Sequence, residues 1–164
     1  MRTVRLPFAI TIALFLLPSE RVFVARAAAN ASSDVAVITA GDVTEDKLAL
    51  SDLRKIVLGD KQFWASGKRI TLLIRAPQAH ERDVILKKVC QMSEAQFRQH
   101  WIAKVFRAEA PSGPKVVNSN QTSLELVSAI PGSIAFVDVT DMPKNQKKLK
   151  IDGREPGEKG YPLQ

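Results

Sequence analysis

Short apolar runs alternate along the chain with segments in which apolar residues recur at helical spacing. The runs at residues 35–38, 70–74 and 134–137 contain β-branched residues and are only four or five residues long. Runs of this length predict strands that are covered on both faces of a sheet. The second run must end before Pro77, because proline cannot continue a strand ladder. A further strand is predicted near the C-terminus, at residues 148–151.

Four helices are predicted between these strands from apolar residues that lie three and four positions apart. The first follows Ser51, a candidate N-cap, and Gly59 is its predicted end. The third follows Ser93, which has Gln96 at the spacing of a capping box. The predicted helices cover residues 52–58, 79–91, 94–106 and 122–130. Phe97, Trp101 and Val105 of the third are expected to face the core, with His100 as a further candidate.

Strands and helices alternate in the predicted order β, α, β, α, α, α, β, β. Buried strands that are separated by helices are typical of a three-layer α/β sandwich, with helices on both faces of the sheet. We place this domain at residues 30–164, which is long enough to bury one core of moderate size.

Residues 1–29 are predicted to be an export signal rather than part of the domain. Two arginines precede the apolar run at residues 6–17, which is too short to span a bilayer but has the length of a signal-peptide core. Small residues follow, and we place the cleavage site after Ala27 or Ala29. The exported protein would then be periplasmic or secreted. The alternative is an uncleaved membrane anchor.

Export changes the net charge of the mature chain. The 24 Lys and Arg and 17 Asp and Glu residues give +7, and residues 1–29, with four Arg and one Glu, contribute +3 of it. The remaining +4 is spread along the sequence, apart from the lysines at 147, 148 and 150. A nucleic-acid site would need denser clustering with aromatic residues, so none is predicted. We interpret the lysines as a solvated strand edge, with contact to a membrane or an acidic partner as the lesser alternative.

Residues typical of catalytic and metal sites are sparse. Cys90 is the only cysteine, and its helical spacing from Leu86 and Val89 predicts a buried thiol rather than a nucleophile. The two histidines lie 20 residues apart, outside any metal-ligand spacing. No nucleophile elbow or Walker loop is present. We therefore predict that the protein is not an enzyme and has no cofactor and no metal.

Five local patterns resemble, in the same order along the chain, those of the periplasmic substrate-binding proteins of phosphate ABC transporters. They are the helix SDLRKIVLG at 51–59, Trp64 in the next loop, the strand ITLLIR at 70–75, the turn and strand PGSIAFV at 131–137, and a closing motif from IDG at 151–153 to GYPL at 160–163. The resemblance covers residues 34–164. It implies one lobe of the periplasmic binding protein-like II fold, without enzymatic activity.

The resemblance also implies an anion site at the end of the second predicted strand. The family motif R-x-x-x-S-G-T corresponds here to Arg75 followed by Ala79, His80 and Glu81, with Arg82 next in sequence. The arginine is retained and the hydroxyl donors are lost, although a helix start still offers backbone N–H groups. His80 can donate a hydrogen bond and Arg82 adds positive charge, whereas the Glu81 carboxylate would repel an anion.

Two interpretations stay open for most of these residues. Arg75 is either an anion ligand or one half of a strand-end ion pair with Glu81. His80 is more simply an exposed helix residue, and Glu81 a carboxylate that stabilises its own helix by roughly 0.3–1 kcal/mol. Trp64 and Trp101 are interpreted as packing residues, with contact to a partner protein as the alternative for Trp64.

We predict an exported, non-enzymatic solute-binding-like protein that binds phosphate or another oxyanion at Arg75 and residues 79–82. The mature chain is about half as long as the two-lobed proteins that it resembles, so most of the first lobe would be absent. The alternative is therefore a ligand-free periplasmic interaction or sensor-accessory module built on one lobe. The expected partners are an oxyanion, an ABC transporter permease or another periplasmic protein, and a second copy in a homodimer. Contact with nucleic acid, or with a membrane after signal cleavage, is not expected.

Overall fold

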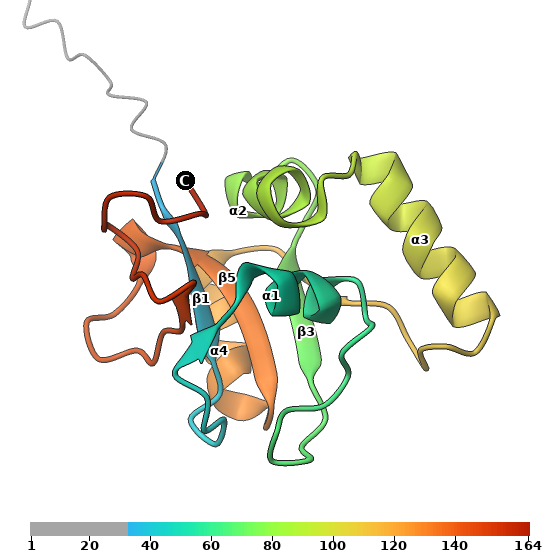
Figure 1. The fold of residues 1–164 in the computed structure, drawn as a ribbon, viewed down its shortest axis with the longest axis horizontal. Helices are drawn as coiled ribbons and strands as arrows, with labels where there is room; N and C mark the ends of the chain where they lie inside the picture. Colours follow the sequence, from blue (N-terminus) through green and yellow to red (C-terminus); the bar gives the residue numbers. More distant parts are fainter. Residues whose placement is uncertain (1–32) are drawn as a thin grey trace, which may run out of the picture. The chain divides into compact units, whose positions relative to one another are not determined.

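The computed structural model describes residues 33–164 of the chain (Figure 1). The predicted export signal at residues 1–29 lies outside the described residues. In chain order the elements are β1 (Val35–Thr39), β2 (Lys47–Leu48), α1 (Leu50–Val57), β3 (Thr71–Arg75), α2 (His80–Val84), the π-helical segment η1 (Ile85–Cys90), α3 (Glu94–Phe106), β4 (Lys115–Val117), α4 (Asn120–Ala129), β5 (Ser133–Asp138), the 3₁₀ turn η2 (Val139–Asp141) and β6 (Lys150–Ile151).

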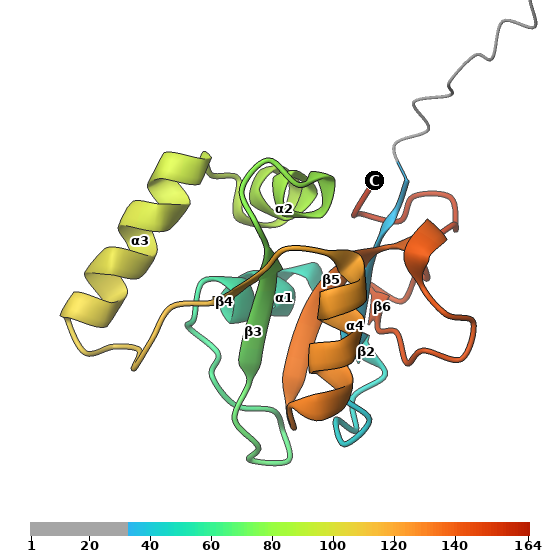
Figure 2. The same cartoon turned by 180° about the vertical axis from the view of Figure 1, so that it is seen from behind.

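Four strands form the main sheet, in the order β1-β5-β3-β4. Strand β3 pairs in parallel with both β5 and β4, whereas β1 pairs antiparallel with β5. Strands β2 and β6 form a separate parallel pair. Parallel strands need crossover connections. In this protein α2, η1 and α3 connect β3 to β4, and α4 connects β4 to β5 (Figure 2).

Helices cover both faces of the main sheet, so the fold has three layers (Figures 1 and 2). Helices α1 and α2 with η1 lie on one face, and α4 lies on the other. Successive strand residues enter opposite apolar clusters: Val37 and Phe136 belong to the first cluster, and Ile38 and Ala135 belong to the second. All four side chains are completely buried. The predicted three-layer α/β sandwich is confirmed, and its strands are apolar on both sides because both sides are covered.

The C-terminal segment covers the outer edge of β1. The Leu149 N–H donates to the Val37 carbonyl oxygen at 2.8 Å, and the Val35 N–H donates to the Leu163 carbonyl oxygen at 2.9 Å. The Tyr161 hydroxyl donates to the Val35 carbonyl oxygen at 2.8 Å. Because these groups take up the backbone hydrogen bonds of β1, the C-terminal segment protects this edge from further strand pairing.

The lysines at 147, 148 and 150 flank the buried Leu149 on the solvent side. Lys147 pairs with Asp46 at 3.2 Å, while Lys148 and Lys150 pair with Glu155 at 2.8 and 3.2 Å. Hydrogen bonds from Lys148 and Lys150 lower the pKa of Glu155. Two carboxylates thus offset most of the positive charge of the cluster.

The structure corrects several predicted bounds. The first helix starts at Leu50 after the N-cap Ala49, so Ser51 lies inside the helix rather than at its cap. The predicted helix at residues 79–91 changes to π-helical geometry from Ile85 onwards. Strands β2 and β4 have no counterpart in the prediction, because two or three residues carry too little pattern to be recognised.

Helix α3 buries only a narrow side of its surface. The capping box predicted at its start is present, with Ser93 and Gln96 each accepting from the backbone N–H of the other. Phe97 and Trp101 are buried as predicted, but Val105 is 39% exposed. The prediction for Val105 is wrong because α3 lies beside the β4 edge of the sheet (Figure 2), where one side of the helix alone meets the core.

The loop after α1 is tied to the turn before β5. Trp64 is 2% exposed and its Nε1 donates to the Gly132 carbonyl oxygen at 2.8 Å. The Gly132 N–H donates to Asp42 at 3.1 Å, and Lys68 Nζ donates to the same carboxylate at 2.7 Å. These bonds, with that from Lys68 as the strongest cause, lower the pKa of Asp42. Gly132 has φ +69°, and a Cβ there would clash with the Arg69 carbonyl oxygen.

We expect Gly132→Ala to destabilise the fold more than Gly67→Ala. Both glycines have positive φ, +69° and +78°, but a Cβ at Gly67 meets no atom within 4 Å among the described residues. The left-handed backbone alone costs a non-glycine residue about 1–2 kcal/mol. The clash with the Arg69 backbone should add about 1–3 kcal/mol for Gly132→Ala.

Urea unfolding followed by tryptophan fluorescence and by circular dichroism would measure both free energies of unfolding. Gly67→Ala is the matched control for backbone conformation. Equal losses in the two variants would show that the turn relaxes freely around an added methyl group, contrary to this prediction.

Candidate functional site

The carboxyl ends of β3, β4 and β5 meet at one edge of the main sheet, because these strands run in the same direction. A helical segment follows each strand: α2 after β3, α4 after β4 and η2 after β5. Open α/β sheets bind ligands at this edge, where the N-terminal N–H groups of helices are also found. The predicted site residues lie here, between the end of β3 and the first turn of α2: Arg75, Ala79, His80, Glu81 and Arg82.

The side chains of Arg75 and Glu81 form an ion pair at the end of β3. Arg75 Nε donates to Glu81 Oε2 at 3.3 Å, and the two side chains are 14% and 6% exposed. Of the two interpretations of Arg75, the ion pair is therefore present in the structure. The pair leaves Arg75 Nη1 buried without a hydrogen-bond partner among the described residues.

Arg82 is fully used by contacts within the protein. Its Nε and Nη2 donate to the two carboxylate oxygens of Glu94 at 2.7 and 2.8 Å, and its Nη1 donates to the Arg75 carbonyl oxygen at 2.9 Å. The guanidinium also lies 5.3 Å from the centre of the Phe97 ring. A bidentate pair of this kind is among the stronger interactions of an arginine. Arg82 therefore joins β3, α2 and α3, and its donors do not point to an open site.

Ala79 and His80 begin the helix without a side-chain cap. Ala79 is the N-cap residue and has no side-chain oxygen to offer. His80 is exposed, as its simpler interpretation predicts, and its Nε2 lies 3.0 Å from the Ser33 carbonyl oxygen. Neither residue reproduces the hydroxyl donors that the resemblance would place at these positions.

Carboxylates of β5 and η2 lie at the same edge of the sheet. Asp138 accepts from the Ser33 hydroxyl and from the Thr140 N–H and hydroxyl. Burial favours a higher pKa for Asp138, but these hydrogen bonds and the His80 ring outweigh it, so the pKa is lowered. Asp141 accepts from the amide of Asn120 at 2.8 Å. Asp138 therefore stays ionised, and the edge carries more negative charge than an anion site favours.

Sequence reasoning did not identify the roles of Glu94 and Asp138. Glu94 lies 12 residues after Arg82, and the geometry of the π-helical segment between them determines how close the two side chains come. No spacing rule covers such a pair. Asp138 could have been identified as a strand-end residue, because it directly follows the apolar run at residues 134–137.

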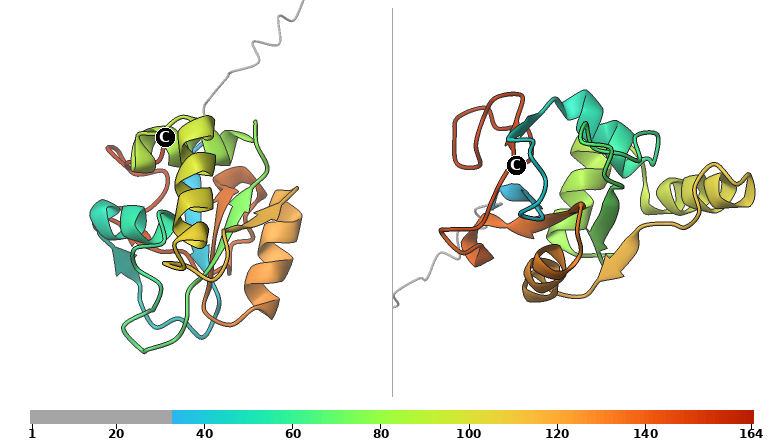
Figure 3. Two further views of the ribbon diagram at one scale, coloured as in Figure 1. Left: turned by 90° about the vertical axis from the view of Figure 1, so that its right-hand side faces the viewer. Right: turned by 90° about the horizontal axis from the view of Figure 1, so that it is seen from below.

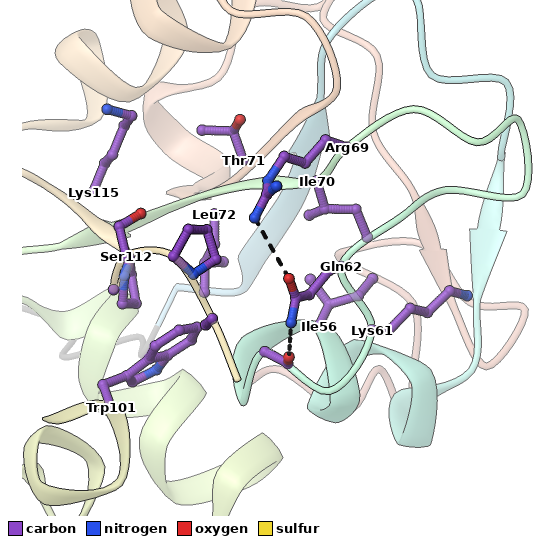
Figure 4. A pocket seen from close by; sticks show the side chains of 15 residues that line it. Ile56, Lys61, Gln62, Arg69, Ile70, Thr71, Leu72, Trp101, Ser112 and Lys115 are labelled. Atoms are coloured by element: carbon purple, nitrogen blue, oxygen red, sulfur yellow. Dashed lines mark hydrogen bonds between the residues drawn. The ribbon is translucent and has the colours of Figure 1, made fainter. Parts of the chain in front are cut away.

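A pocket with a volume of about 120 Å³ lies beside the start of β3 and the loop before β4 (Figure 4). The Arg69 guanidinium points to Gln62, whose Oε1 accepts at 3.5 Å. Gln62 Nε2 donates to the carbonyl oxygens of Gly59 and Glu109 at 3.2 and 2.7 Å. The side chains of Lys61 and Lys115 extend away from the pocket. These donors do not converge on one point, so the pocket has no arrangement for a particular ligand.

Metal and nucleophile chemistry has no support in the described part of the chain. Within residues 33–164 no three His, Cys, Asp or Glu side chains are grouped as metal ligands would be. Cys90 is buried, and burial raises the pKa of its thiol to about 11. None of the helices that the structure describes is long and apolar enough to cross a membrane.

The fold resembles solved structures of phosphate transport proteins. PstS from Borrelia burgdorferi has a TM-score of 0.64 and 17% identity, over 80% of this chain and 54% of its own. An ABC-type phosphate transport receptor from Vibrio cholerae has a TM-score of 0.60 and 15% identity, over 76% of this chain and 48% of its own. A substrate-binding protein from Clostridium perfringens, solved with bound phosphate, has a TM-score of 0.61 and 16% identity, over 76% and 47%.

These similarities establish the fold and no more, because sequence identity is low. The chain spans about half the length of the solved proteins that it matches. No family model and no curated protein matches the sequence. The predicted periplasmic-binding-protein-like fold is confirmed, while phosphate binding by these residues stays a prediction.

We expect Arg75→Met to lower the free energy of unfolding by about 3 kcal/mol, because it leaves the buried Glu81 carboxylate without its partner. Adding Glu81→Leu should recover most of that loss, since an apolar pair needs no charge compensation. Urea unfolding of the single and double variants measures both effects. Lys87→Met is the control, because the pair of Lys87 with Asp83 is 73% and 50% exposed. If Arg75→Met lowers the free energy of unfolding no more than Lys87→Met does, water screens the pair of Arg75 with Glu81.

We expect Cys90 to react with a thiol reagent only after unfolding. A rise of the pKa from 9.0 to about 11 lowers the thiolate fraction near pH 8 about 100-fold. Alkylation by iodoacetamide, followed by mass spectrometry with and without urea, should therefore show at least this ratio of rates. Equal rates would make Cys90 an accessible thiol and would reopen a nucleophilic role.

Proposed function

We propose that the protein is an exported, non-enzymatic, solute-binding-like protein. Its own Glu81 carboxylate occupies the place beside Arg75 where an anion would bind. It then acts through contacts with other proteins rather than by capturing free phosphate. The observation that carries this proposal is the buried pair of Arg75 with Glu81. The fold supports the assignment as a solute-binding-like protein. The residues at the edge of the sheet support the replacement of an external anion by the Glu81 carboxylate.

An external anion would have to displace Glu81 before it reached Arg75. Glu81 is held in the first turn of α2, so its carboxylate stays next to Arg75. A group joined by a short flexible linker has an effective concentration of about millimolar, and a group held in a helix has a higher one. Free phosphate at lower concentration competes poorly with such a group. Displacement would also leave the Glu81 carboxylate without its positively charged partner. Because Glu81 is buried, a charge without a partner there is costly.

The surroundings of the pair oppose an anion further. The ionised Asp138 lies near His80 and lowers the attraction of the edge for negative charge. Arg82, the further cation at the helix start, is held by Glu94. The remaining donors are backbone N–H groups at the start of α2, and Glu81 belongs to that same first turn.

Oxyanion binding at Arg75 is the second candidate function. It is favoured by Arg75 Nη1, a buried donor that has no partner among the described residues. An oxyanion could accept from Nη1 together with Nη2 at the end of the guanidinium, which is one of the two bidentate arrangements that arginine offers to carboxylates and phosphates. Under this candidate Glu81 regulates access to Arg75 rather than replacing the ligand.

Export and the class of partner belong to the same proposal. The basic start and the apolar run at residues 6–17 support a signal peptide and hence a periplasmic or secreted location. The solved neighbours include a phosphate transport receptor and a substrate-binding protein of an ABC transporter. A transporter permease or another periplasmic protein is accordingly a reasonable class of partner.

We expect wild-type protein to show no saturable phosphate binding below about 10 mM, and Glu81→Ser to bind with a Kd of about 1 mM or tighter. Removing the carboxylate frees Arg75 and returns a hydroxyl donor to the helix start. The double variant Arg75→Met/Glu81→Ser should not bind. Isothermal titration with phosphate and sulfate would measure all three proteins.

Glu125→Ser is the control for net charge, because Glu125 is exposed on α4, outside the site. It should behave as the wild type does. Micromolar phosphate binding by the wild type that is lost in Arg75→Met would overturn the first candidate and establish the second. No binding by Glu81→Ser would show that Glu81 is not what keeps phosphate out.

A further inference from the structure

The pair of Arg75 with Glu81 has the weaker geometry of the two arginine–glutamate pairs at the end of β3. A single hydrogen bond joins it, from Nε to Oε2 at 3.3 Å. Arg82, in contrast, donates to both carboxylate oxygens of Glu94, at 2.7 and 2.8 Å. Charge-assisted hydrogen bonds of nitrogen donors are normally about 2.7–2.9 Å long, and bidentate pairs are the strongest of them. Glu81 therefore holds Arg75 less firmly than Glu94 holds Arg82.

The Arg75 guanidinium also has a donor that Glu81 does not use. Its Nη1 is buried and has no hydrogen-bond partner among the described residues. Buried polar atoms are nearly always hydrogen-bonded, so an unused arginine donor indicates a place for a further acceptor. Helix α2, which carries Glu81, lies above the end of β3 (Figure 1 and the left view of Figure 3). Because Nη1 is buried, an acceptor from outside reaches it only when the pair of Arg75 with Glu81 loosens.

Two negative groups at one guanidinium repel each other. An oxyanion at the end of the Arg75 guanidinium would lie close to the Glu81 carboxylate, which is bonded to Nε of the same group. A like charge within about 4–6 Å favours the neutral form of a carboxyl group, and burial favours that form further because it removes water from the charge. A neutral Glu81 can also donate a hydrogen bond to the oxyanion. An oxyanion and a proton therefore favour each other's binding at this place.

We propose that oxyanion binding at Arg75 is coupled to the uptake of one proton by Glu81, so that the site is closed near neutral pH and opens as the pH falls. This inference deepens the proposed function and rests on it, because the proton removes the negative charge that keeps an external anion from Arg75. The coupling is reciprocal: a proton on Glu81 strengthens anion binding, and a bound anion strengthens proton binding by the same factor. The ligand class is that of small inorganic oxyanions.

Charged groups on the strands around α2 do not compete for this role. Helix α2 packs against β3, β5 and η1. Arg75 of β3 is the charged side chain that is bonded to Glu81 among the described residues. Asp138, at the end of β5, has a lowered pKa, because its hydrogen bonds outweigh the opposite effect of burial. Asp138 therefore stays ionised between about pH 5 and about pH 7.5, and it adds the same repulsion at both ends of this range.

The charged side chains of α2 and η1 are the other groups near Glu81. His80 is exposed, and a histidine can change its charge near about pH 6.5, so the experiment needs a variant of His80 as a control. The other charged residues of these two segments are exposed or paired with side chains other than Glu81: Arg82, Asp83, Lys87 and Lys88. Glu81 is thus the carboxylate whose protonation would free the Arg75 guanidinium.

Sulfate is the probe for this coupling, because its charge is constant between about pH 5 and about pH 7.5, whereas phosphate titrates in this range. Isothermal titration of the wild-type protein should give a sulfate Kd at least about tenfold lower at the acidic end of the range than at the neutral end. Titration near pH 5 in two buffers of different ionisation enthalpy counts the protons. About one proton should be taken up per sulfate, and this count does not depend on the folding of any variant.

Glu81→Gln keeps the size of the side chain and removes its charge. It should bind sulfate with the same Kd at both pH values and take up no proton. His80→Gln controls for the nearby histidine, and Glu125→Gln controls for the loss of an exposed carboxylate elsewhere. Both controls should keep the pH dependence of the wild type, and Arg75→Met should abolish binding at both pH values. Circular dichroism at each pH shows whether each protein is folded.

Three results would overturn the coupling: a wild-type sulfate Kd that does not change with pH, binding near pH 5 without proton uptake, or a pH dependence that Glu81→Gln keeps or His80→Gln loses. If Glu81→Ser nevertheless binds phosphate near neutral pH, the proposed function stands and this inference alone fails. Wild-type binding in the micromolar range near neutral pH that still tightens with proton uptake overturns the proposed function alone. Sulfate binding that survives in Arg75→Met would place the anion elsewhere and overturn the coupling as well.

Discussion

Two arginine–glutamate pairs at the carboxyl end of β3 hold the sheet and two of its helices together. Arg75, the last residue of the strand, binds the Glu81 carboxylate through its side chain and the Arg82 guanidinium through its carbonyl oxygen. Arg82 in turn binds Glu94, the first residue of α3. The three segments thus share one network of charges, and the strand end sets the position of both helices. Because the side chains of Arg75, Glu81 and Arg82 are mostly buried, each of these charges depends on its partner for stability.

The same network determines what the edge of the sheet can bind. An anion site needs donors that lack internal acceptors. Here Glu81 and Glu94 accept from the two arginines, and Arg75 Nη1 is left without an acceptor among the described residues. The fold is similar to that of solved phosphate-binding proteins, while the change of chemistry at the strand end belongs to our proposal. Fold and function separate easily in this way, because the fold depends on apolar strands and the function on a few side chains at their ends.

The limits of sequence prediction follow from the same division. The strands at 35–38, 70–74 and 134–137 could be predicted because both faces of the sheet are covered, which makes each run apolar throughout. Strand β4 could not, since it has three residues and Val116 faces solvent. For α3, helical spacing shows which residues share a side but not which side meets the sheet, and Val105 was placed wrongly for this reason. The pair of Arg75 with Glu81 could be foreseen because a strand end adjoins the first turn of the next helix. The pair of Arg82 with Glu94 could not, because it spans a π-helical segment.

The contacts of Arg82 connect the end of β3 with the apolar groove between α3 and β4. Arg82 and Glu94 line that groove, and Arg82 also donates to the carbonyl oxygen of Arg75. An arginine that would add positive charge to an anion site therefore fixes the start of α3 and the wall of the groove. Because Arg82 contacts the carbonyl oxygen of Arg75 rather than its side chain, the link from β3 to α3 does not depend on the Arg75 guanidinium. The end of β3 and the start of α3 therefore depend on one set of charged contacts.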